Sequence, residues 1–111
     1  MTHNTDLIVP ISQLRSERIN QARAVAGNWD VIQVGALLQH VIRAHATSEL
    51  AEGNPIAVSV TFDVSDPVEA GEEISFESRI DRRTRTLIFA SGTATQGARH
   101  LLKATVVFRI A

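Results

Sequence analysis

The stretch Asp30–Leu50, DVIQVGALLQHVIRAHATSEL, has the pattern of a long helix that is buried on most sides. It contains no proline and a single glycine, Gly35, so little in it interrupts a helix. Apolar side chains cover most of the helical circumference and leave a narrow polar stripe at helical spacing: Gln33, His40, Arg43 and Thr47. The pattern therefore predicts a central helix wrapped by the rest of the chain. Its polar residues make the stretch unsuited to crossing a bilayer.

The chain after this helix alternates between apolar and polar residues, which is the period of strands. Strands are predicted at about 56–64, 73–81, 86–95 and 100–110, and the short turns between them indicate antiparallel neighbours. In the first strand, one face is predicted to carry Ile56, Val58, Val60, Phe62 and Val64.

The predicted helix and strands have matching lengths. A helix of about 21 residues is about 32 Å long, and a strand of about 10 residues spans about 33 Å. One apolar sheet face can therefore cover the helix from end to end. The fold class is predicted to be α+β, with Phe62, Phe76 and Phe108 packing near Leu38 and Val41.

The N-terminal part, residues 1–27, is predicted to be an arm followed by a helix. Leu7–Val9 is a short apolar segment before Pro10, and it suits either an edge strand or an anchoring arm. Ser12 is a plausible N-cap for a helix that runs to about Ala26. The whole chain, 1–111, is predicted to be a single domain, with the central helix and the sheet in 28–111.

The composition excludes some kinds of chemistry and gives no support for some partners. A net charge of −1 gives no electrostatic reason to expect nucleic acid or an anionic membrane as a partner. The absence of cysteine excludes disulfides, thiol nucleophiles and thiolate metal sites. No histidine or acidic cluster has metal-ligand spacing, so neither a metal nor a cofactor is expected. No export signal is visible at the N-terminus, so a cytoplasmic location is expected.

A long buried helix followed by PVEAGEEISFESRIDRRTRTLIFASGTATQGARHLLKATVVFRIA (67–111) resembles the hotdog-fold thioesterases, especially the phenylacetate-pathway acyl-CoA type. The resemblance covers roughly residues 28–111. The shared features are Pro67-Val68 before Gly71, the arginine-rich turn at 82–85, and Gly97 before a last strand that ends Phe108-Arg109-Ile110. The resemblance implies a hotdog fold, in which an antiparallel sheet wraps around a long central helix. It also implies a homodimer or homotetramer whose partner is an acyl-CoA or acyl-carrier thioester.

The resemblance places the thioester site between subunits, near the start of the central helix. Backbone N–H groups and the positive end of the helix dipole can stabilise charge on a thioester oxygen there. Asn28 fits the amide position of the family pattern, and Gly35 fits the glycine whose N–H faces that oxygen. Gln33-Val34 stand where the pattern has His-Gly, and the position of its catalytic carboxylate falls at Arg43 or the neighbouring Ile42.

Two residues are candidates for the catalytic base. Asp30 is the carboxylate nearest to the predicted site, and His40 is the alternative because imidazole suits proton transfer near neutral pH. Each also has a structural interpretation: Asp30 as an acid favoured by the helix dipole, Asn28 as a helix cap, and His40 and Arg43 as hydrogen-bonded residues at a subunit interface.

The remaining candidates are substrate-binding residues. Gln33 and Arg43 lie on the polar stripe, where they would line a polar pocket. The resemblance assigns Arg82, Arg83 and Arg85 to the phosphates of coenzyme A, which suits guanidinium chemistry. The same arginines would otherwise form a solvated hairpin turn.

The sequence leaves three functional classes. The first is an acyl-CoA thioesterase that hydrolyses a small to medium acyl thioester. The second is a hotdog protein that binds acyl-CoA or an acyl carrier without hydrolysing it. The third is a cone-shaped α+β protein with a small-molecule pocket.

Overall fold

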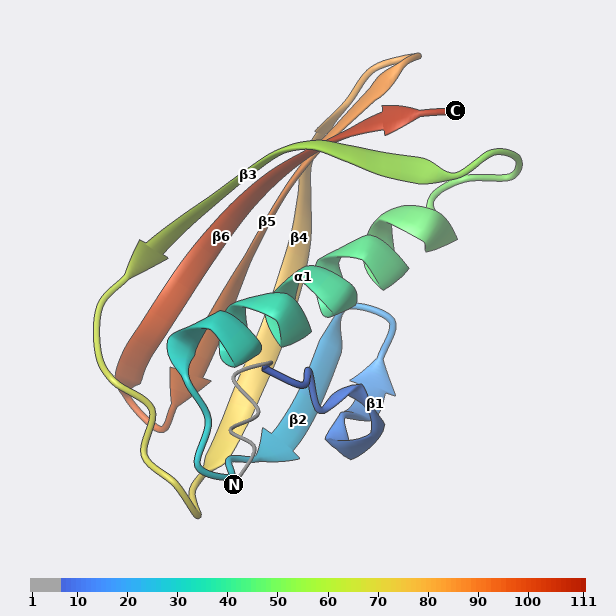
Figure 1. The fold of residues 1–111 in the computed structure, drawn as a ribbon. Helices are drawn as coiled ribbons and strands as arrows, with labels where there is room; N and C mark the ends of the chain where they lie inside the picture. Colours follow the sequence, from blue (N-terminus) through green and yellow to red (C-terminus); the bar gives the residue numbers. More distant parts are fainter. Residues whose placement is uncertain (1–6) are drawn as a thin grey trace, which may run out of the picture.

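A computed structural model describes residues 7–111, which form one α-helix and a six-stranded antiparallel sheet of order β1-β2-β4-β5-β6-β3 (Figure 1). The sheet curves around α1, which lies along one of its faces. The elements in chain order are the 3-10 helix η1 Ile11–Gln13, β1 Arg15–Arg18, β2 Gln21–Val25, α1 Val31–Ser48, β3 Pro55–Val64, β4 Glu73–Arg83, β5 Leu87–Gln96 and β6 Arg99–Ile110. The expected α+β architecture, with a sheet wrapped around a long helix, is confirmed.

The core lies between α1 and the sheet. One side of α1 is buried, and its residues are Val34, Gly35, Leu37, Leu38, Val41, Ile42 and Ala46. They meet fully buried side chains of the central strands, including Phe76 on β4 and Phe108 on β6. Gly92 on β5 allows this close approach, because a Cβ at that position would lie 2.8 Å from the side chain of Ile42.

The helix predicted for residues 12–26 is wrong, since this segment forms η1 and the hairpin β1–β2. β2 pairs with β4, and its side chains alternate: Ala22 and Ala24 face the core, whereas Arg23 and Val25 are exposed. Alanine favours helices, but backbone pairing with β4 overrides that weak preference. The predicted edge strand or arm at Leu7–Val9 is not a strand, and Val9 packs against the core.

Ion pairs fix this hairpin to β4. Glu73 accepts hydrogen bonds from Arg15 at 2.6 Å and from Arg23 at 2.8 Å, and Arg23 also pairs with Glu17. Hydrogen bonding from Arg23 and Arg15 lowers the pKa of Glu73 from its ordinary value. The same contacts raise the pKa of Arg23, with the hydrogen bond to Glu73 as the main cause. All four side chains are exposed, so the network positions the strands more than it stabilises them.

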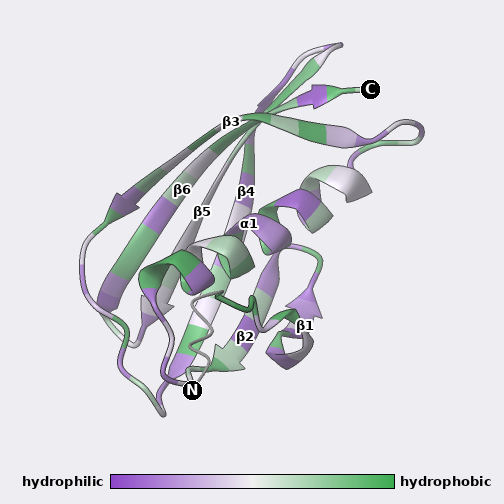
Figure 2. Ribbon diagram, viewed as in Figure 1, coloured by the Kyte–Doolittle hydropathy of each residue, from purple (hydrophilic) through white to green (hydrophobic). Residues whose placement is uncertain are grey.

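β3 is a long edge strand whose apolar side chains remain exposed. The predicted strand is present, but a bulge between Ala57 and Ser59 shifts its register against β6. Ile56 is opposite the exposed Arg109 and Val60 is opposite the buried Val106, so the prediction that both share one face is wrong. Phe62 was also predicted to lie in the core, but it is 41% exposed. Figure 2 shows hydrophobic segments along β3 and β6.

Phe108→Ala is expected to lower the free energy of unfolding by about 3–5 kcal/mol, because it leaves a cavity under α1. Phe89 is a matched control, since it lies on the opposite face of the sheet beneath Arg82 and is only half-buried. Phe89→Ala should cost clearly less in the same urea-denaturation measurement. Equal losses in the two variants would contradict this description of the core.

Candidate functional site

The start of α1 is organised by Asp30, which is its N-cap. Asp30 Oδ1 accepts the N–H of Ile32 at 2.9 Å, and the N–H of Asp30 donates to Gln33 Oε1 at 2.8 Å. The carbonyl of Asp30 accepts the N–H groups of Gln33 and Val34. These reciprocal bonds form a capping box, so the N–H groups of Ile32, Gln33 and Val34 are already bonded within the chain.

Gln33 also connects the helix to the N-terminal segment. Its Nε2 donates to the carbonyl of Ile8 at 2.8 Å while its Oε1 accepts from Asp30. Both ends of the Gln33 amide therefore have partners inside the protein. Asn28, which was interpreted as a cap or an amide donor, lies in an exposed bend before the helix, and the cap is Asp30 instead.

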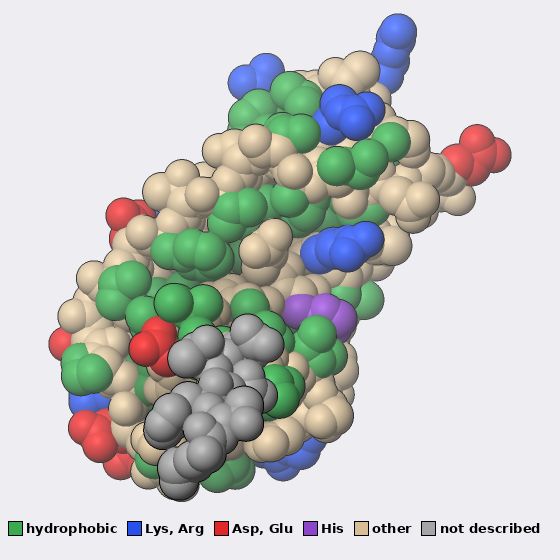
Figure 3. All heavy atoms as spheres, viewed as in Figure 1, with side chains coloured by type: hydrophobic (Ala, Val, Ile, Leu, Met, Phe, Trp, Pro, Cys, Tyr) green, Lys and Arg blue, Asp and Glu red, His purple; other side chains and the backbone are tan. Residues whose placement is uncertain are grey.

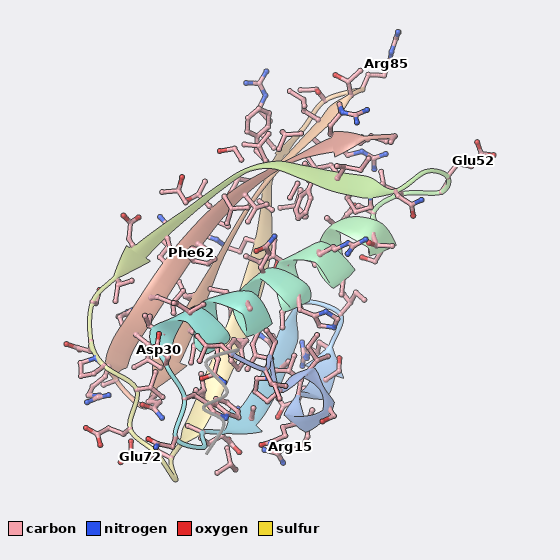
Figure 4. The ribbon with its side chains drawn as sticks, in the orientation of Figure 1. Arg15, Asp30, Glu52, Phe62, Glu72 and Arg85 are labelled. Carbon is pink, nitrogen blue, oxygen red and sulfur yellow. The ribbon has the colours of Figure 1, made fainter. Side chains whose placement is uncertain are left out.

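An apolar pocket lies between the first turns of α1 and the last residues of β3. Its lining residues are Val31, Ile32, Gly35, Phe62, Val64 and Leu102, and its volume is about 200 Å³. Gly35 makes room for Phe62, because a Cβ on Gly35 would be 3.2 Å from the phenyl ring. Figure 4 shows Asp30 and Phe62 at the same end of the molecule. The sequence prediction included Gly35 but missed Phe62, which alternation alone assigned to the core.

A second pocket, the basic pocket, lies on the exposed side of α1. Val9, Ile11, Ala36, Gln39, His40 and Arg43 line a volume of about 220 Å³. His40 and Arg43 were predicted to share a polar stripe, and the structure brings them together here. Asp30 is ten residues before His40, which is about 15 Å along a helix axis. One chain therefore cannot apply both candidate bases to the same reacting atom.

The hairpin arginines lie far from the start of α1. Arg83 donates to the carbonyl of Glu49 at 2.6 Å and so bonds the C-terminal end of the helix. Arg82 lies 5.8 Å above the ring of Phe89. Arg85 is exposed in the turn, at the end of the molecule opposite Asp30 (Figure 4). A single chain does not bring these arginines to the helix start.

A partly buried polar pair, missed by the sequence interpretation, joins α1 to β4. His45 Nδ1 lies 3.0 Å from Ser78 Oγ, and His45 Nε2 lies 4.0 Å from Glu49 Oε1. Serine, histidine and an acid are the residue types of a hydrolytic triad. Ser78 is completely buried beneath the helix, so its hydroxyl is closed to a substrate and the pair is structural. No local sequence pattern identifies it, because its residues are far apart in the chain.

Residues 7–111 show neither a metal-binding cluster nor a helix that could span a membrane. Within residues 7–111, no group of three or more histidine and acidic side chains is arranged to hold a metal ion. The α-helix there is not long and apolar enough to cross a membrane.

No family model and no curated protein matches the chain. Solved structures do match. A phenylacetic acid degradation-related protein of Ralstonia eutropha superposes with a TM-score of 0.76 at 18% identity, over 96% of this chain and 94% of that one. The chain has the hotdog fold.

Two further solved structures that match the chain contain coenzyme A. A Bacillus halodurans protein matches with a TM-score of 0.77 at 13% identity, over 89% of this chain and 72% of that one. A hypothetical thioesterase of Streptococcus pneumoniae matches with a TM-score of 0.75 at 10% identity, over 88% and 86%. These matches confirm the predicted hotdog fold and disfavour the cone-shaped alternative.

Replacement of Asp30 separates its capping role from its charge. Asp30→Ala removes the acceptor for Ile32 N–H and should lower the free energy of unfolding by about 1 kcal/mol. Asp30→Asn should cost less, because asparagine caps helices about as well as aspartate. Thermal and urea unfolding of both variants tests this. An alanine variant as stable as the wild type would show that the cap contributes nothing.

Proposed function

We propose that this hotdog protein binds acyl-CoA or acyl-carrier thioesters and hydrolyses them. The apolar pocket beside the first turns of α1 is the observation that carries the proposal. It suits a small to medium acyl chain, Gly35 lines it, and Asp30 directly precedes the lining residue Val31 in the chain. Binding of coenzyme A by proteins of the same fold supports the assignment.

We further propose that the functional unit is a homodimer, or a homotetramer built from it, formed by pairing of β3 with β3 of a second copy. The two edges of the sheet differ greatly. β1 has only the residues RSER and contains a bulge, which discourages further pairing. β3 has ten residues and exposes Val58, Val60, Phe62 and Val64. Figure 3 shows hydrophobic side chains gathered on this side of the molecule.

Antiparallel pairing of two β3 strands would complete the site. Ile56 of β3 is level with Arg109 and Leu87, next to the hairpin turn, whereas Val64 is level with Leu102, next to the apolar pocket. These ends are about 26 Å apart along the strand. A two-fold axis places the Ile56 end of one copy beside the Val64 end of the other. The hairpin of one copy, with Arg82, Arg83 and Arg85, then approaches the helix start of the other.

The proposed site gives each predicted residue a role. The acyl chain lies in the apolar pocket, and the thioester carbonyl lies near Gly35. Asp30 takes a proton from a water molecule that Asn28 orients, the water oxygen attacks the carbonyl carbon, and the carbon–sulfur bond breaks to release the coenzyme A thiol. The hairpin arginines of the second copy bind the coenzyme A phosphates.

Binding without hydrolysis is the second candidate, and one observation favours it specifically. α1 contains no carboxylate from Val31 to Ser48. Arg43 stands near the position where the resemblance expects the acid, and the Asp30 carboxylate is already engaged as the helix cap. Such a chain could hold an acyl thioester without cleaving it.

The proposed interface predicts that Val60→Lys converts the oligomer to a monomer, because it places a charge within the exposed apolar row of β3. Light scattering at micromolar concentration measures the change. Ser16→Lys on β1 is the control, since it adds the same charge at the opposite edge and should leave the mass unchanged. A monomeric wild-type protein would contradict the proposed interface and the shared site.

The proposed chemistry predicts that Asp30→Asn lowers the rate of coenzyme A release from acyl-CoA by about 10²–10⁴-fold, the usual effect of losing a general base. Because asparagine retains the helix cap, the loss reports on the chemistry. His40→Ala tests the alternative base in the same assay. If neither variant loses tenfold, the site is wrongly placed. A wild type that binds acyl-CoA without turnover would establish the non-catalytic candidate.

A further inference from the structure

The apolar pocket beside the first turns of α1 has a buried floor and an exposed rim. Gly35 and Leu102 are buried, whereas Ile32 and Val64 are 64% and 58% exposed. None of the lining residues has a side chain that donates or accepts a hydrogen bond. The affinity for an occupant therefore depends on how much hydrocarbon fits against the walls.

Phe62 closes this pocket along β3. Side chains alternate between the two faces of a strand, so Val60, Phe62 and Val64 share one face over this uninterrupted stretch of pairing with β6. Phe62 and Val64 line the pocket, but Val60 does not. Along α1, Gly35 is the last lining residue. The pocket thus ends where Gly35 and Phe62 meet.

The ring of Phe62 lies directly against the helix backbone. A Cβ on Gly35 would be 3.2, 3.4 and 3.6 Å from the ring atoms Cε1, Cζ and Cδ1, so one edge of the ring faces the bare backbone of the glycine. The same ring is 41% exposed and belongs to an edge strand. It can therefore be shortened without emptying the core between α1 and the central strands.

The size of the pocket sets the length of the chain that it can hold. Its volume is about 200 Å³. A methylene group takes up roughly 30 Å³, about the share of one water molecule in the liquid, so the pocket has room for about six. The six ring carbons of Phe62 occupy a comparable space directly beyond it.

We infer that Phe62 sets the upper limit of the acyl chain, so that affinity rises with chain length up to about six carbon atoms and no further. The inference deepens the proposed function and rests on it, because that function places the acyl chain in this pocket. It assigns Phe62 to substrate selection and not to the bond-breaking step.

The test titrates the protein calorimetrically with non-hydrolysable thioether analogues of butyryl-, hexanoyl- and decanoyl-CoA. The wild type should gain about fourfold in affinity for each methylene between butyryl and hexanoyl, the usual effect of burying one methylene, and nothing between hexanoyl and decanoyl. Phe62→Ala removes the ring and should bind the decanoyl analogue about tenfold or more tighter than the hexanoyl one. Phe62→Leu removes fewer carbons and should give a smaller gain.

Val60→Ala is the matched control. Val60 is 38% exposed in the same apolar row of β3, but it does not line the pocket. This variant removes apolar surface from the same strand and should keep the wild-type dependence on chain length. Circular dichroism and light scattering check that each variant has the fold and the mass of the wild type.

Four results would overturn the inference. A decanoyl affinity that exceeds the hexanoyl one equally in the wild type and in Phe62→Ala would do so and leave the proposed function intact, as would a wild-type plateau retained in Phe62→Ala. A shift in Val60→Ala as large as that in Phe62→Ala would assign the effect to the strand surface instead. A wild type that binds none of the three analogues more tightly than free coenzyme A would overturn the inference together with the proposed position of the acyl chain.

Discussion

The approach of Ile42 on α1 to Gly92 on β5 sets the distance between helix and sheet. A side chain at residue 92 would meet both Ile42 and the carbonyl of Glu77, so the helix could not lie so close to the central strands. The close approach lets Phe76 and Phe108 fill the space on either side with no exposed surface. It also fixes α1 lengthwise, and this decides which helical residues reach the end of β3 and which face solvent.

The two edge strands of the sheet differ in how readily they can pair with a further strand. β1 is short, charged and bulged, and the Arg15–Glu73–Arg23 contacts hold its hairpin against β4. β3 is long and carries exposed apolar side chains, because α1 does not cover that edge. An uncovered apolar strand with unpaired backbone groups favours association. The apolar pocket lies at this edge, so the candidate site and the candidate interface share Phe62 and Val64.

At the start of α1, the residue that caps the helix, Asp30, is also the proposed catalytic base. Asp30 and Gln33 form the capping box, and Gln33 also holds Ile8. These hydrogen bonds hold both side chains in place, but they also occupy polar atoms that a substrate would otherwise contact. Arg43 and His40 are in the opposite situation, since they lie on an open face and can respond to a ligand.

Local sequence determined the central helix and the strands after it. The helix was predicted from a proline-free run that is apolar over most of its circumference, and the strands from long runs of period two. Residues 12–26 were mistaken for a helix because Ser12 suits a helix cap and because one helical face is roughly marked by Ile11, Leu14, Ala22 and Val25. Pairing with β4 selected the hairpin instead. The side of the sheet to which Ile56 points depended on a bulge that leaves no clear signal in the sequence. Sequence also found Asp30, Gly35, His40 and Arg43 on one helix. Only the tertiary structure showed that Phe62 joins Gly35 and that the hairpin arginines lie at the other end of the sheet, because such proximities arise from packing between distant segments.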